Sequence, residues 1–195
     1  MNQRHIVVGI SGASGIPVAI KVLHVLQSDP SVFVHLVISD SGKVTIESET
    51  EYSLNEVTSL ADEVNDNRDI TADIASGSFP TVGMLIVPCS MKTIAGINSG
   101  YSDSLLLRAA DVTLKESRKL VLAIRESPFS QIHLRNLYEL SQCGAVILPL
   151  VVNYYSRPQN INDLTTQLAG KILRQFEITC PDYFCWTGVD KNASV

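Results

Sequence analysis

Short apolar runs alternate along the chain with segments of helical periodicity. The apolar runs are rich in Val, Ile and Leu with little polar alternation, which is typical of strands buried on both faces of a parallel sheet; they cover residues 5–10, 32–38, 84–88, 120–124 and 145–149. Helical patterns lie near residues 16–28, 42–50, 54–63, 92–99, 103–118, 130–142 and 161–176. Residues 64–80 are polar, which predicts an irregular connection. This alternation predicts an α/β fold with a three-layer, doubly wound parallel sheet.

The length and composition favour one domain that associates with copies of itself. The chain has 195 residues, enough for one α/β domain, and it shows no internal repeat or linker. We therefore expect residues 1–195 to form a single domain, with residues 177–195 as an extended C-terminal arm. Hydrophobic residues make up 45% of the chain and charged residues only 18%. A surface this apolar predicts a homo-oligomer.

The net charge of −5 argues against a nucleic-acid partner, because phosphate backbones require a basic face. No apolar stretch approaches the length of a membrane span, and no secretory signal is visible, so we expect a cytoplasmic protein without a membrane partner. Four cysteines are scattered without the framework of a disulfide-bonded protein, and no cluster has metal-ligand spacing; they are Cys89, Cys143, Cys180 and Cys185. We expect reduced thiols and no metal.

Small polar residues follow the strands of the predicted sheet. The exits are Ser11–Gly15, Ser39–Gly42, Cys89–Thr93 and Arg125–Pro128. Ligands of open α/β sheets bind beyond the carboxyl ends of the strands, where N–H groups of helix starts attract anions. Each exit taken alone could be only a turn or a helix cap. Four exits at one edge predict a site for a phosphorylated ligand.

The first exit lies in the sequence GISGASG, whose glycines are Gly9, Gly12 and Gly15. The spacing G-x-x-G-x-x-G differs from the G-x-G-x-x-G of dinucleotide-binding proteins, which disfavours an NAD-dependent oxidoreductase, although Asp40 near the second strand is a conceivable ribose partner. Equally, the loop could be a tight turn in which Ser14 caps the following helix.

Several charged and aromatic residues allow two interpretations each. Lys115 shares a helical stripe with Arg108 and Asp111, which is either a solvated face or part of a site. Lys171, at the edge of an apolar stripe, either extends to water or binds an anion. The pair Arg125–Glu126 after the fourth predicted strand is either a surface ion pair or a phosphate clamp beside an acid. Tyr155 follows the fifth strand and either packs or faces the ligand.

An ordered set of motifs resembles the UbiX family of flavin prenyltransferases over about residues 5–177. The set comprises GISGASG, SDSG, VPCSMKTIAGI, RAADVTLKE, LVLAIRESP, HLRN and YYSRPQ. The resemblance implies a Rossmann-like or flavodoxin-like fold and a dodecamer with active sites at subunit junctions. It also implies an enzyme that joins a dimethylallyl group, carried as dimethylallyl monophosphate, to N5 and C6 of reduced FMN. The product, prenylated FMN, is the cofactor of UbiD-type decarboxylases, which serve ubiquinone synthesis or aromatic-acid decarboxylation.

Position by position, the resemblance also implies a set of site residues. The FMN contacts would be Gly12, Ala13, Ser14, Ser39, Ser90, Met91, Lys92, Thr93 and Arg125. The prenyl phosphate contacts would be Lys115, Arg125, Glu126, Tyr155 and Lys171. The catalytic residues would be Glu126, which gives a proton to the departing phosphate, Lys115, whose charge offsets the dianion, and Ser14 nearby.

Two alternatives stay open within this interpretation. One is an FMN-binding accessory subunit of an aromatic-acid decarboxylase that has no catalysis of its own; the retained set of Lys115, Glu126, Tyr155 and Lys171 argues against it. The other is an FMN-dependent decarboxylase of a peptidyl or pantothenoyl cysteine, which the lysine in CSMKT disfavours.

Overall fold

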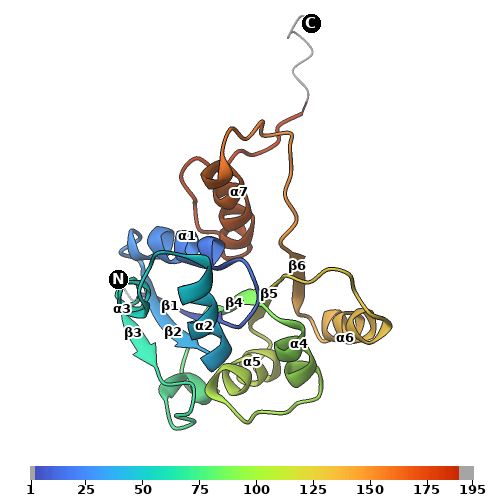
Figure 1. The fold of residues 1–195 in the computed structure, drawn as a ribbon. Helices are drawn as coiled ribbons and strands as arrows, with labels where there is room; N and C mark the ends of the chain where they lie inside the picture. The colour runs from blue at the N-terminus through green and yellow to red at the C-terminus, as the bar shows by residue number, and fades with distance from the viewer. Residues whose placement is uncertain (1–2, 189–195) are drawn as a thin grey trace, which may run out of the picture.

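Six parallel strands form one sheet in the order β3-β2-β1-β4-β5-β6 (Figure 1). A computed structural model describes residues 3–188. Each neighbouring pair in this sheet runs parallel. The strands are β1 (Arg4–Ile10), β2 (Val32–Ile38), β3 (Glu63–Asn65), β4 (Gly83–Cys89), β5 (Lys119–Ile124) and β6 (Val146–Pro149). This is the doubly wound order, so the predicted fold class is confirmed.

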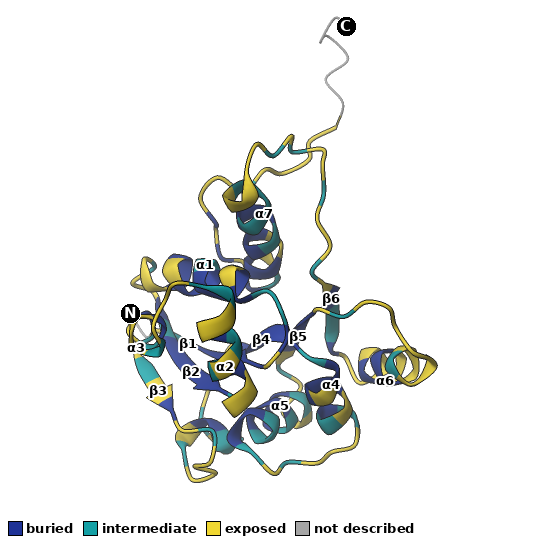
Figure 2. Ribbon diagram, in the orientation of Figure 1, coloured by how far each residue is buried: buried dark blue, intermediate teal, exposed yellow. Residues whose placement is uncertain are grey.

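Helices cover both faces of the sheet and bury an apolar core on each side. They are α1 (Ile16–Gln27), α2 (Asp40–Glu49), α3 (Leu54–Thr58), α4 (Met91–Asn98), α5 (Leu105–Lys115), α6 (Gln131–Gln142) and α7 (Ile161–Leu173), with short 3₁₀ turns η1 (Asp73–Ala75) and η2 (Arg174–Phe176). One core joins α1, α3 and α7 to the sheet, and the other joins α4, α5 and α6 to the opposite face. The central strands β1 and β4 are almost entirely buried, which explains their continuous apolar runs (Figure 2).

The region around residues 54–65 differs from the prediction. The helix expected over 54–63 ends at Thr58, and the segment expected to be irregular begins with the edge strand β3. Three residues are too few to produce a readable periodicity. The strand exists because Glu63, Val64 and Asn65 pair with β2, which is a tertiary contact.

The first part of the C-terminal arm folds back along α7. The ring of Tyr183 packs on Gly170, where an added Cβ would lie 2.3 Å from Tyr183 Cδ2. Gln167 donates a hydrogen bond to the carbonyl of Asp182 at 3.3 Å. The arm then brings Phe184 and Trp186 next to Tyr155. The rest of the predicted arm, residues 189–195, lies outside the described residues. Within residues 3–188, no helix combines the length and the apolar character needed to cross a bilayer.

Candidate active site

The loops after β1 and β4 meet at the carboxyl edge of the sheet, where the strand order reverses. Ser11 joins them: its hydroxyl donates to the carbonyl of Pro88 at 2.9 Å and accepts the N–H of Ser90 at 2.8 Å. Ser11 is buried, so these bonds are shielded from water. The two loops are thus fixed at the topological switch point, the usual ligand site of such sheets.

A cavity of about 860 Å³ opens beside these loops. Its walls come from the exits of β1, β2 and β4 together with residues of the 66–68 turn, α4, α5 and α6. Five of the residues predicted to contact FMN line it: Gly12, Ser39, Ser90, Lys92 and Thr93. Of the other four, Ala13 and Met91 are buried at the edge of the same loops, whereas Ser14 and Arg125 lie in a separate cluster described below.

Two helices begin at this cavity, and each N-terminus is capped by a predicted site residue. The Ser39 hydroxyl accepts the N–H of Gly42 at 3.0 Å at the start of α2, and the Ser90 hydroxyl accepts the N–H of Thr93 at 3.3 Å at the start of α4. Their remaining N–H groups and the positive ends of the helix dipoles favour an anion, and Lys92 lines the same cavity.

Gly12 allows the first loop to lie directly against the start of α2. A Cβ at this position would lie 2.3 Å from the Cβ of Ser41. Any side chain here would push the β1 loop away from α2 and close the space between them, so this glycine is required by close approach.

Glu49, which sequence reasoning missed, lies at the centre of the second cluster. Its Oε2 accepts the N–H groups of Gly15 at 2.8 Å and Ile16 at 3.0 Å, and the Ser14 hydroxyl lies nearby. Burial raises the pKa of Glu49, but the Ser14 hydroxyl, the two backbone hydrogen bonds and the positive charge of Arg125 outweigh it, so the pKa is lowered. Glu49 is therefore ionised at neutral pH.

The interpretation of Ser14 as a helix cap is wrong, because Gly15 occupies the cap position of α1 and the carboxylate of Glu49 performs the capping. Ser14 instead lies beside Glu49 and helps to lower the pKa of that carboxyl group. No sequence motif predicts that Glu49 lies near Gly15, because only the packing of α2 beside α1 brings them together. The one cue that the sequence offered was an acidic residue at the end of α2.

Arg125 and Glu126 leave β5 at the same carboxyl edge. The N–H of Arg125 donates to the carbonyl of Cys89 at 3.2 Å, which ties the β5 exit to the β4 exit. Glu126 is half-buried, and its Oε1 accepts the N–H of Ser127 at 3.0 Å. Both residues thus lie where the sequence placed them.

Tyr155 lies on the long loop after β6, which extends away from the sheet (Figure 1). Its side chain is 48% exposed and packs on Phe184 and Trp186, with ring centroids 6.0 and 5.6 Å away. An apolar surface built by these three rings therefore faces outward from the chain.

Lys115 and Lys171 lie away from the carboxyl edge of their own chain. Lys115 ends α5, four residues before β5 begins at Lys119, whereas Glu126 follows the other end of β5. A rise of about 3.3 Å per residue separates the two ends of that strand by roughly 20 Å. Lys171 lies in the last turn of α7, whose continuation contacts the start of β5 through Lys119 and Gln175. A single chain does not bring these lysines to Glu126.

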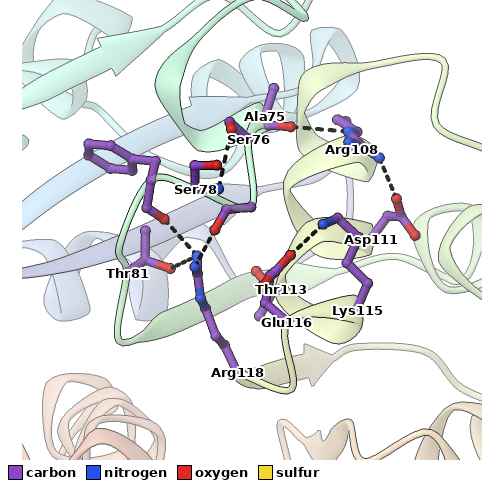
Figure 3. A network of polar contacts seen from close by, with 12 residues as sticks. Ala75, Ser76, Ser78, Thr81, Arg108, Asp111, Thr113, Lys115, Glu116 and Arg118 are labelled. Carbon is purple, nitrogen blue, oxygen red and sulfur yellow. Dashed lines mark hydrogen bonds and ion pairs between the residues drawn. The ribbon is translucent and has the colours of Figure 1, made fainter.

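A loop of residues 75–81, which falls in the irregular connection predicted over 64–80, lies beside Lys115, a position that the sequence did not reveal (Figure 3). Two arginines hold its backbone: Arg108 donates to the carbonyl of Ala75 at 3.1 Å, and Arg118 donates to the carbonyls of Gly77 at 2.6 Å and Phe79 at 2.7 Å. A Cβ on Gly77 would lie 2.6 Å from Lys115 Nζ, so the ammonium lies directly against this glycine. Glu116 pairs with Lys115, and this ion pair lowers the pKa of Glu116.

The fold, the capped helix starts and the cavity at the switch point together define a mononucleotide-binding protein of the flavodoxin-like class. Residues 1–173 match the family model described as Flavoprotein. The flavin prenyltransferase UbiX of Escherichia coli K12 is 48% identical over 95% of this chain and 100% of its own length. A probable UbiX-like flavin prenyltransferase of Sedimentibacter hydroxybenzoicus is 46% identical over 94% of this chain and 97% of its own length. The chain belongs to the UbiX family of flavin prenyltransferases, within the flavoproteins.

Two solved structures have nearly the same fold. AnUbiX (PadA1), solved in complex with FMN and dimethylallyl pyrophosphate, superposes with a TM-score of 0.94 at 46% identity, covering 97% of this chain and 100% of its own. A dodecameric FMN-dependent UbiX-like decarboxylase from Escherichia coli O157:H7 superposes with a TM-score of 0.93 at 45% identity, covering 94% of this chain and 100% of its own. The cypemycin decarboxylase CypD, at 17% identity and a TM-score of 0.62, shares the fold alone.

Proposed function

We propose that this protein transfers a dimethylallyl group from dimethylallyl monophosphate to N5 and C6 of reduced FMN, which makes prenylated FMN. The observation that carries this proposal is the cavity at the switch point, lined by the β1 and β4 exits and by two capped helix starts, in a chain of this family. AnUbiX, with a TM-score of 0.94 to this chain, was solved with FMN and dimethylallyl pyrophosphate.

The chain's residues fit FMN. Gly12 leaves room where a side chain would meet Ser41, the starts of α2 and α4 offer N–H donors, and Lys92 adds a positive charge. Gly12, Ala13, Ser14, Ser39, Ser90, Met91, Lys92, Thr93 and Arg125 would hold the flavin mononucleotide. Reduced FMN supplies the electron-rich ring that accepts the allyl group.

Ser14 and Glu49 would serve the flavin side of the site. A Ser14 hydroxyl that donates to the ionised Glu49 beside it would keep its oxygen lone pairs free to accept a hydrogen from the ligand. The pair is therefore arranged as an acceptor for a flavin N–H, with Glu49 as the base behind the hydroxyl.

Glu126 would supply a proton to the departing phosphate. Breaking the allylic C–O bond leaves negative charge on the phosphate, and cations placed where this charge develops lower the barrier. Arg125 adjoins Glu126 at the β5 exit, and Lys115, Tyr155 and Lys171 complete the proposed phosphate set. Arg108 and the loop of residues 75–81 support Lys115 from behind.

Neighbouring subunits would bring Lys115 and Lys171 to Glu126, because one chain keeps them at opposite edges of its sheet. We propose a homo-oligomer, and specifically a dodecamer like that of the UbiX-like protein from Escherichia coli O157:H7. Large apolar side chains on α6 and on the loop after β6 are available for such contacts: Ile132, Leu134, Tyr138, Val151 and Tyr154 are each more than half exposed.

We propose that a UbiD-type decarboxylase receives the product and that the reaction takes place in the cytoplasm, which the four free cysteines support. We further propose that residues 1–195 form a single flavoprotein domain, with 177–195 as its arm. The absence of a metal requirement stays a prediction.

The test is anaerobic incubation of the purified protein with reduced FMN and dimethylallyl monophosphate, followed by mass spectrometry of the released flavin. We expect a flavin heavier by one C5 unit. A parallel incubation with dimethylallyl pyrophosphate determines which phosphate ester is the donor. An unchanged flavin with both donors, despite tight FMN binding, would reject the transferase and favour the accessory flavin-binding subunit.

A further inference from the structure

A pair of histidines, His35 buried and His5 half-buried, lies beneath the loop of residues 75–81. His5 on β1 and His35 on β2 approach through His5 Nδ1 and His35 Nε2, which are 2.8 Å apart. His35 is only 1% exposed. The ring of Phe79, which belongs to the loop, meets both imidazoles edge-on, with centroids 5.3 Å from His5 and 5.2 Å from His35. The histidines therefore form the floor on which this loop lies.

The contacts of the pair determine its protonation state. A hydrogen bond between two ring nitrogens holds one proton, so one nitrogen donates and the other accepts. His35 Nδ1 meets no acceptor of normal hydrogen-bond geometry within residues 3–188, and the nearest, Glu63 Oε2, is 3.4 Å away. If Nδ1–H of His5 donates to Nε2 of His35, and Nδ1–H of His35 points toward Glu63, each of these two protons faces an acceptor. Protonation of both imidazoles would place an N–H on each of the two facing nitrogens, which are 2.8 Å apart.

The loop of residues 75–81 also supports Lys115, which it contacts through Gly77. From outside, Arg118 holds the carbonyls of Gly77 and Phe79; from inside, Phe79 lies on the histidine pair. Gly77 in turn lies against the Lys115 ammonium. A continuous chain of contacts thus leads from His35 through Phe79 and Gly77 to Lys115. This chain is short, and each link is a direct packing or hydrogen-bond contact.

We propose that His35, paired with His5, is a positioning residue: in its neutral state it holds the loop of residues 75–81 in place and so places Lys115 to bind the prenyl phosphate. The proposal rests on the proposed function, because Lys115 has its role there. Double protonation of the pair separates the imidazoles, moves Phe79 and releases the loop. Binding of the prenyl donor therefore weakens in acid, whereas FMN binding at the other edge of the sheet is unchanged.

The electrostatic surroundings agree with this direction. Burial lowers the pKa of His35 below its ordinary value of 6.5; Glu63 on β3 and Asp73 on η1 oppose this shift, and His5 on β1 adds to it. Since the folded-state pKa is the lower one, the stabilising effect of the neutral pair is complete above about pH 6.5. It is lost as the pH falls below that value toward the folded-state pKa.

The first experiment measures amide hydrogen exchange in residues 75–81 of the whole protein between pH 8 and pH 5.5, corrected for the intrinsic pH dependence of exchange. We expect the protection of this loop to fall with the pH in the wild type but to be constant in His35→Gln. His24→Gln, which changes an exposed histidine of α1, serves as the matched control and should behave like the wild type. Unchanged protection in the wild type, or the same pH dependence in His35→Gln, would overturn the proposal.

The second experiment measures the KM for dimethylallyl monophosphate and the Kd for FMN over the same pH range. The donor phosphate itself titrates near pH 6, which changes the KM of both proteins. We therefore compare, at each pH, the KM of the wild type divided by the KM of His35→Gln. We expect this ratio to rise by up to about tenfold per pH unit as the pH falls from about 6.5 toward the lowered pKa of His35, with equal FMN affinity. A ratio that is independent of pH would contradict the proposal.

Phe79→Leu keeps both histidines and removes the ring between them and the loop, so it tests the connection even if His35→Gln fails to fold. We expect weak loop protection that no longer changes with pH. A loop in this variant that still responds to pH like the wild type would refute the coupling. Failure of the proposed function can be distinguished from failure of this proposal. If the proposed function is wrong, the flavin gains no C5 unit in the wild type at any pH, whereas the hydrogen exchange of the loop still depends on pH.

Discussion

The carboxylate of Glu49, at the last residue of α2, accepts the backbone N–H of Gly15 at 2.8 Å and thereby caps α1 in place of a local side chain. Gly15 has a φ of 121°, a conformation that leaves the first N–H groups of α1 pointing toward Glu49. One ionised group therefore connects the glycine loop, two helices and the proposed flavin-binding edge.

Replacing Glu49 with Gln should lower stability and slow prenyl transfer. The amide keeps one weaker acceptor for Gly15 and Ile16 but loses the charge that holds Ser14 and faces Arg125, so we expect a loss of about 1 kcal/mol in the free energy of unfolding. Thermal unfolding at fixed protein concentration measures it. Glu47→Gln, at an exposed site on the same helix, is the control.

The pH dependence of that difference follows from the pKa of Glu49. Burial raises this pKa, but the hydrogen bonds and Arg125 lower it more, so it lies below the ordinary value of 4.5. The stabilising effect of the carboxylate is complete above about pH 4.5 and is lost as the pH falls through the folded-state pKa. The gap between the thermal midpoints of wild type and Glu49→Gln should stay constant from pH 7 to about pH 4.5 and close as the pH is lowered further. A gap that persists at the lower pH would show that the charge is not the cause.

Gly12→Ala should abolish tight FMN binding, because its methyl group would lie 2.3 Å from the Cβ of Ser41. Adding Ser41→Gly removes that atom and should restore part of the affinity, at a helix-propensity cost of about 1 kcal/mol in stability. Isothermal titration with FMN on both variants and on Ser41→Gly alone measures the effect. Equal FMN affinity in Gly12→Ala and wild type would show that the loop is not close to the flavin.

Glu126→Gln should bind FMN normally but transfer the prenyl group about 10²- to 10⁴-fold more slowly, because the departing phosphate loses its acid. Single-turnover prenylation, followed by mass spectrometry of the flavin, is the measurement. Glu51→Gln, an exposed carboxylate outside the site, is the matched control. Wild-type turnover in Glu126→Gln would remove this residue from the mechanism.

Mixing two inactive variants tests whether subunits share each site. Lys115→Ala and Glu126→Gln should each be nearly inactive as pure oligomers, and Lys21→Gln, on the opposite face of the sheet, should be active. In oligomers assembled from equal amounts of both chains, about a quarter of two-subunit sites combine the intact residues, and activity should return accordingly. If no activity returns on mixing, the two residues do not belong to one intersubunit site.

Much of the fold was readable because its signals are local. The five apolar runs became β1, β2, β4, β5 and β6 within one residue at every end, since a strand buried on both faces needs a continuous apolar sequence. β3 was missed because three residues at a sheet edge carry no periodicity, and pairing with β2 alone makes them a strand.

The sequence by itself determined the parallel α/β sheet, the family and the polar exits of its strands, because burial, turn residues and family motifs lie along contiguous stretches of chain. Only the tertiary structure decided that Glu49 caps α1, that His5 and His35 lie beneath Phe79, and that Lys115 lies at the edge opposite Glu126. Such relationships join residues 30 to 74 positions apart in the sequence, or keep apart residues that are only 11 positions from each other. They depend on how helices pack and in which direction each strand runs, and no local pattern of residues encodes either.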